Sequence, residues 1–182
     1  MKEKKSGLYL EFFNPVLAYY QQLTKRERHF ECGIPFFIAL VCTLSYCHFD
    51  LLHKALAVLT PVLLDLTAIL IGLSVLLITI LLTANGAAID RLHEYITGRQ
   101  ITGTKDKLTL YQVFHIHFTY SVISESFLLL LLLFYSFLDG FTNNAIVCWI
   151  FLFLFTFSIL HILFSIIRGV TNLYLSFFKS NS

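Results

Sequence analysis

Charged residues are scarce in this sequence. Asp, Glu, Lys and Arg make up only 13% of its 182 residues, whereas a soluble globular protein carries about 25%. Hydrophobic residues make up 57%, and the mean hydropathy is +0.76. This balance excludes an ordinary soluble domain and indicates a chain that is surrounded mainly by lipid.

Motifs that carry enzymatic chemistry are also lacking. The sequence has no Gly-x-x-x-x-Gly-Lys-Ser/Thr phosphate loop, no Gly-x-Ser-x-Gly nucleophile elbow and no His-Glu-x-x-His zinc pair. Its four cysteines show no spacing typical of metal ligands. His115 and His117 are only two residues apart, so on a helix they point in divergent directions. We therefore expect no enzyme, no cofactor and no metal site, and we assign no catalytic residue.

Four long apolar runs dominate what is present. They span residues 33–49, 55–84, 113–138 and 145–167. A helix rises about 1.5 Å per residue, so about 20 apolar residues cross the hydrocarbon core of a bilayer, which is about 30 Å thick. About eighty residues remain outside the runs, too few for a further soluble domain with its own core. The sequence predicts one all-α integral membrane domain with four transmembrane helices.

Lysine and arginine are nearly absent from two of the links between the runs. Twelve of the thirteen lie in residues 1–32, 85–112 and 168–182, and Lys54 is the exception. The positive-inside rule places these three segments in the cytoplasm. An even number of spans also puts both termini on one side, so the two signals agree. We therefore predict cytoplasmic termini and a cytoplasmic middle link.

The basic segments are expected to carry short amphipathic helices. Asn14 and Pro15 open a helix predicted over residues 15–28 at the inner surface, with packing on neighbouring protein as the alternative. A second cytoplasmic helix is predicted over residues 87–97. The basic side chains are expected to contact lipid headgroups or to dock a partner, rather than to bind nucleic acid directly. They are Lys25, Arg26, Arg28, Arg91, Arg99, Lys105 and Lys107.

Two carboxylates interrupt the apolar runs. Asp65 and Glu125 lie about 15–18 Å from the ends of their runs, near the bilayer midplane, with no Lys or Arg at that depth. A charge there costs at least about 2.5–3.5 kcal/mol. Two interpretations stay open: protonated carboxyls that hydrogen-bond between helices, or carboxyls that face a water-filled cavity, where rings of them would suit cations. His161, in the fourth run, is a third candidate for either role.

Small residues in the second run favour close packing of helices. Ala68-x-x-x-Gly72, followed by Ser74, provides the short side chains that let two helices approach in a membrane. Lipid supplies no hydrophobic drive for helix association, so shape and polar contacts have to supply it. We expect the protein to be a homo-oligomer.

A family resemblance rests on motifs in the second and third runs, between Asp65 and Phe134. These motifs are Gly72-x-Ser74, Leu82-Thr83 and Tyr120-x-x-x-x-Glu125. The pattern resembles small four-span membrane proteins encoded in bacterial antiphage defence islands. The KwaA family, the membrane subunit of the Kiwa system, is similar in length and in number of spans. Membrane accessory proteins found beside some type VI CRISPR nucleases look similar at this level.

The resemblance implies a membrane-embedded oligomer of the bacterial inner membrane that works with a cytosolic DNA-binding effector against phage. It implies no catalytic residue. We expect an oligomeric platform that senses infection or membrane perturbation and docks the effector through its cytoplasmic segments. The alternative is an oligomeric ion channel or pore that depolarises the inner membrane and is lined by Asp65, Glu125 and His161.

Overall fold

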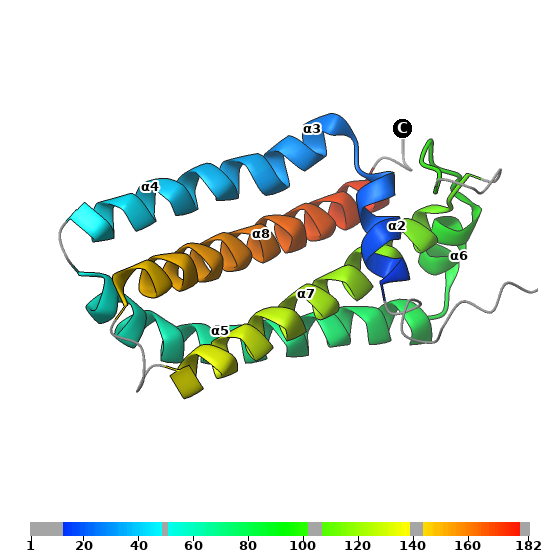
Figure 1. Cartoon of the computed structure of the whole chain (residues 1–182). Helices are drawn as coiled ribbons and strands as arrows, with labels where there is room; N and C mark the ends of the chain where they lie inside the picture. The colour runs from blue at the N-terminus through cyan, green and yellow to red at the C-terminus, as the bar shows by residue number, and fades with distance from the viewer. Residues whose placement is uncertain (1–12, 49–50, 102–106, 139–143, 179–182) are drawn as a thin grey trace, which may run out of the picture.

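Helices make up nearly all of the chain that the structure describes (Figure 1). The computed structural model describes residues 13–48, 51–101, 107–138 and 144–178. An antiparallel bridge pairs Ile96 with Thr109 in the loop between α6 and α7. The helices are α2 (Asn14–Gln22), α3 (Lys25–Arg28), the π-helical turn η1 (His29–Gly33), α4 (Ile34–His48), α5 (Leu52–Thr83), α6 (Ala87–Glu94), α7 (Leu110–Leu138) and α8 (Ala145–Phe178).

Four helices are long and apolar enough to cross a membrane. They are Lys25–His48, Leu52–Thr83, Leu110–Leu138 and Ala145–Leu175. The prediction of an all-α protein with four membrane-spanning helices is confirmed to that extent. α5 has 32 residues and is therefore about 48 Å long. Because this exceeds the hydrocarbon core of about 30 Å, α5 has to tilt or to extend beyond the core.

The chain breaks before the first long helix, which the sequence analysis did not expect. The prediction of one helix over residues 15–28 is wrong, because Leu23 adopts an extended conformation after α2. Thr24 then starts a new helix with a capping box: its Oγ1 atom accepts a hydrogen bond from the Glu27 amide, and Glu27 Oε2 accepts one from the Thr24 amide. The first long helix therefore begins at Lys25, about two turns earlier than expected.

α8 occupies the centre of the bundle (Figure 1). It packs on α4 on one side and on α5 and α7 on the other. Buried apolar side chains fill the space between α5, α7 and α8, among them Leu56, Leu63, Leu128, Leu132 and Phe155. The interior of this part of the bundle is therefore filled by apolar side chains.

The two ends of the bundle differ in charge. α2, α3, α6 and the last turns of α8 lie together at one end, which we call the basic end (Figure 1). The opposite end carries the starts of α5 and α8, and Lys54 is the only Lys or Arg there among the residues that the structure describes. At the basic end α2 crosses the long helices and packs on α7. This crossing covers the site described next.

Candidate functional site

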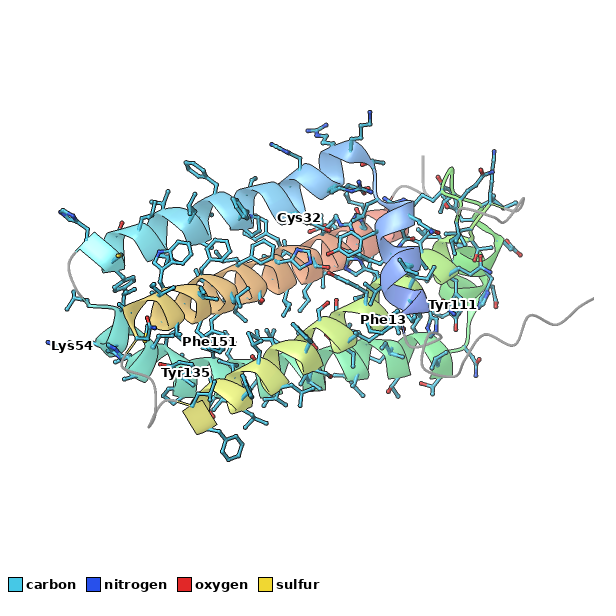
Figure 2. The ribbon with its side chains drawn as sticks, in the orientation of Figure 1. Phe13, Cys32, Lys54, Tyr111, Tyr135 and Phe151 are labelled. Atoms are coloured by element: carbon cyan, nitrogen blue, oxygen red, sulfur yellow. The ribbon has the colours of Figure 1, made fainter. Side chains whose placement is uncertain are left out.

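Polar side chains from distant segments meet at the basic end, crowded between α2, α7 and the end of α8 (Figure 2). They come from α2, the α3–η1 segment, the loop after α6, α7 and α8. We call them the polar cluster. Its members are Tyr19, Glu27, Glu31, Arg99, His117, Tyr120, His161, Ser165 and Arg168.

The π-helical turn η1 places Glu31 inside the bundle. In this turn the Ile34 amide donates to the His29 carbonyl, five residues back, so the turn is wider than its α-helical neighbours. Single π-helical turns inside α-helices occur frequently at functional sites. The Glu31 side chain is 0% exposed. A carboxylate at such a position needs a charged partner in the protein, because water does not reach it.

Arg168 of α8 supplies that partner and is the centre of the polar cluster. Its Nε atom pairs with Glu31 Oε1, and its Nη1 atom lies 3.0 Å from Glu27 Oε1. Its Nη2 atom donates a hydrogen bond to the Tyr19 hydroxyl at 3.2 Å. The forked guanidinium group suits such multiple pairing. Within α8, the positive charge of Arg168 is therefore compensated by Glu27 and Glu31 of the first long helix.

A second arginine ties the loop between α6 and α7 to the Glu27 carboxylate. Arg99 Nη2 lies 2.5 Å from Glu27 Oε1. The backbone of the loop is held by the Leu108 amide, which donates to the Arg99 carbonyl, and by the Thr97 amide, which donates to the Leu108 carbonyl. Arg99 was expected at a lipid or partner surface. The structure places its side chain, 23% exposed, in a partly buried ion pair with Glu27.

His117 of α7 approaches the backbone of α8. Its Nε2 atom donates to the Ser165 carbonyl at 2.9 Å, and its Nδ1 atom accepts from Arg168 Nη2 at 3.3 Å. Gly169 makes this approach possible, because a Cβ atom at that position would lie 2.5 Å from His117 Nε2. The absence of a side chain at Gly169 is therefore a requirement of the polar cluster.

His161 links the first and last long helices. Its Nδ1 atom lies 2.8 Å from the Glu31 carbonyl, which can only accept, so Nδ1 carries the hydrogen. Its Nε2 atom then accepts from the Tyr120 hydroxyl at 2.6 Å. The Tyr20 hydroxyl, 2.9 Å from that of Tyr120, donates to it in turn. This hydrogen-bonded chain joins α2, η1, α7 and α8.

Tyr19 joins α2 to the ion pair. Its hydroxyl donates to Glu31 Oε2 at 2.5 Å and lies 3.0 Å from Ser165 Oγ. Its ring stacks on Tyr120 with the ring centroids 3.7 Å apart. Burial raises the pKa of the Tyr19 phenol above its ordinary value, an effect that Arg168 opposes and Glu31 strengthens. Tyr19 therefore remains a neutral hydrogen-bond donor across the physiological pH range.

Glu125 makes an interhelical contact near the middle of the bundle. Ser74 Oγ of α5 donates to Glu125 Oε1 at 2.7 Å, and the Glu125 residue is fully buried on α7. Interhelical hydrogen bonds of this kind hold membrane helices together. The polar pair lies against the apolar core between α5 and α7. Glu125 of α7 and His161 of α8 thus contribute to separate contacts inside the bundle.

Asp65 lies on an exposed face of α5. Its side chain is exposed, and it forms no hydrogen bond or ion pair within the described part of the chain. Ala68 and Gly72 are exposed on α5 as well, and a Cβ atom on Gly72 would meet no neighbouring atom within 4 Å. One chain therefore does not bring Asp65 together with Glu125 or His161. The three form a common site only if several copies assemble.

Most of the basic residues expected at a docking or headgroup surface are exposed at the basic end. Arg28 donates to the Tyr20 carbonyl at 3.1 Å, and Lys105 lies outside the residues that the structure describes. Among the described residues, no group of three His, Cys, Asp or Glu side chains is arranged to hold a metal ion. The basic residues that are exposed at this end of the bundle are Lys25, Arg26, Arg28, Arg91 and Lys107.

Sequence reasoning missed the ion pairs at the centre of the polar cluster. A signal was present, because Glu27 and Glu31 are four residues apart and so share one face of a helix. Arg168 ends the fourth apolar run at the same end of the bundle. Matching these charges requires the knowledge that the first and fourth long helices are neighbours, and no local pattern contains that information.

The four apolar helices define a multi-pass α-helical membrane protein. Comparisons with models of known families, with curated proteins and with solved structures found no match.

Proposed function

We propose that the protein is the membrane subunit of a bacterial antiphage defence system. It acts as an oligomeric platform in the inner membrane that senses infection or membrane perturbation and docks a cytosolic DNA-binding effector. The resemblance of the second and third spans to KwaA-type proteins supports the defence role. The observation that carries the platform role is the polar cluster, which joins α2, the loop between α6 and α7 and the end of α8 in one braced surface.

The same contacts couple the spans to that surface. Arg168 belongs to α8, while Glu27 and Glu31 belong to the first long helix. A change in the tilt of either helix within the bilayer moves these charges relative to one another. Because buried ion pairs tolerate little displacement, such a tilt also shifts α2 and the loop that Arg99 holds. Contiguous networks of this kind carry coupling between distant parts of a protein.

Asp65 supports the proposed self-association. It lies thirteen residues after the start of α5 at Leu52, about 20 Å along the helix and thus inside a hydrocarbon core about 30 Å thick. A carboxyl group exposed to lipid at this depth is costly. A second copy packed on the small residues Ala68 and Gly72 removes the Asp65 carboxyl from lipid and offers it a hydrogen-bond partner.

Cysteine cross-linking tests this face. In a chain whose four native cysteines are replaced by alanine, Ala68→Cys is expected to form a disulfide-linked dimer in membranes when an oxidant is added. Phe127→Cys, at a residue of α7 that is 64% exposed, is the matched control on a different face. Equal dimer yields at the two positions, or none at Ala68→Cys, would remove the α5 face as the contact surface.

Ion conduction is the second candidate function, and the position of Asp65 favours it. In a ring of copies the α5 faces would bring several Asp65 carboxyls together, and rings of carboxylates suit cations. Currents in liposomes that contain the purified protein, and their loss in Asp65→Asn, are the observations that would support this function. Currents unchanged in Asp65→Asn would exclude the carboxyl as a lining group.

Docking is tested by co-expression with the soluble protein encoded beside this gene. Lys25→Glu combined with Arg26→Glu is expected to lower the amount captured about ten-fold, since each lost charge contact contributes up to about 1 kcal/mol. Acidic residues suit the first turn of a helix, so α3 is retained. Lys54→Glu at the opposite end is the control. The platform proposal fails if the wild type captures nothing, or if both variants lower capture equally.

A further inference from the structure

A groove opens between α4 and α5 toward the opposite end of the bundle. Its volume is about 560 Å³. It exists because α4 packs mainly on α8 and contacts α5 very little, so α8 forms the floor between two separated walls (Figure 1). The lining residues that matter here are Tyr46 from α4, Lys54, Val58 and Val62 from α5, and Leu152 and Thr156 from α8.

Polar groups stand at the mouth of this groove, and apolar groups line its depth. Lys54 projects from the start of α5 at the end of the bundle (Figure 2), and Tyr46 lies near the end of α4. Val58 and Val62 follow Lys54 at intervals of about one turn, so the α5 wall continues about 12 Å into the bilayer. Val58 is 69% exposed and Val62 56% exposed, which leaves apolar surface for a chain to cover.

Lys54 is a cation at the mouth of the groove, and the part of the chain that the structure describes offers it no counter-charge. Among the described residues its ammonium group forms no ion pair, and the Tyr46 hydroxyl forms no hydrogen bond. A side chain at the end of a membrane helix lies at the depth of the lipid headgroups, where lysine attracts anionic lipid. Lys54 and the apolar walls of the groove together suit an anion that carries an apolar chain.

We propose that this groove binds one anionic glycerophospholipid. The phosphate accepts from the Lys54 ammonium and the Tyr46 hydroxyl, and one acyl chain lies along Val58, Val62 and Leu152. The volume falls within the range of about 300–1,000 Å³ that is typical of small-molecule sites. Free phosphate would leave the apolar walls uncovered, and a neutral lipid would leave Lys54 without an anion. This site is independent of the proposed function in defence.

Native mass spectrometry of the full chain released from detergent measures the bound lipid directly. Phosphatidylglycerol is expected to be retained about five-fold better than phosphatidylcholine with the same acyl chains, as one lysine at a membrane surface contributes about 1 kcal/mol. Lys54→Gln is expected to abolish this preference. Lys107→Gln is the matched control: it removes an exposed lysine at the basic end, where any headgroup contact lies outside the groove, and it is expected to keep the preference.

A second pair of variants tests the apolar part of the site. Val58→Trp fills the groove and is expected to lower retention of both lipids, whereas Ile69→Trp, at a residue of α5 that is 68% exposed and outside the groove, is expected to leave it unchanged. The proposal is overturned if Lys54→Gln and Lys107→Gln behave alike, if Val58→Trp and Ile69→Trp behave alike, or if inorganic phosphate displaces the lipid fully.

Discussion

Arg168→Gln is expected to lower the free energy of unfolding by about 3–5 kcal/mol, the largest effect of any substitution considered for this protein. The reason is that Glu31, which is 0% exposed, would keep its carboxylate without the cation that compensates it. Glu27 and Tyr19 would also lose their contacts with the guanidinium group. Thermal unfolding in detergent micelles, followed by circular dichroism of the helices, measures the loss.

Two further variants separate the ion pair from a general effect of losing a charge. The double variant Glu31→Gln/Arg168→Gln is expected to recover a large part of the stability, because it removes both buried charges together. Arg26→Gln, at an exposed residue of α3, is expected to change stability by less than about 0.5 kcal/mol. If Arg168→Gln were no more destabilising than Arg26→Gln, the ion pair would not be the centre of the polar cluster.

Gly169→Ala is expected to destabilise the protein by about 2–4 kcal/mol, although it adds only one methyl group. The added Cβ atom would lie 2.5 Å from His117 Nε2, so His117 has to leave the Ser165 carbonyl and release Arg168. The estimate combines the cost of overpacking, about 1–3 kcal/mol, with the loss of a buried hydrogen bond, about 1 kcal/mol. The same unfolding measurement reports the change.

Gly72→Ala is the matched control within another membrane helix. A Cβ atom on Gly72 meets open space, and alanine favours a helix over glycine by about 0.5–1 kcal/mol, so this variant is expected to be neutral or more stable. The comparison is made in a detergent that keeps the chain monomeric, so that the α5 face proposed for self-association does not contribute. Similar losses at Gly72 and Gly169 would contradict the close approach of His117.

The spans were predictable from the sequence because their cause is local. A run of about 20 apolar residues is sufficient to specify a membrane helix, and the four runs correspond to the four long helices. The start of the first helix was predicted less well. The helix begins at the polar residues Lys25 to Arg28, before the apolar run. It can begin there because a capping box formed by Thr24 and Glu27 satisfies the free amides at the helix end.

The candidate site was predictable only in part. Depth along a helix follows from residue number, so the sequence placed Asp65, Glu125 and His161 within the spans. Which way each side chain faces depends on where neighbouring helices lie. α7 covers one face of α5 and brings Glu125 to Ser74, while none of the helices that the structure describes covers the face that carries Asp65.

The four membrane-spanning helices, and the basic segments at one end of them, follow from the amino-acid sequence alone. Hydropathy and charge are sums over neighbouring residues, so they can be read without knowing the fold. The three-dimensional arrangement of the helices sets the rest: Arg168 pairs with Glu27 and Glu31, and Arg99 pairs with Glu27. It also sets the close approach of His117 to Gly169. These contacts join residues far apart in the chain, and their energies depend on distances that only the packing of the helices sets.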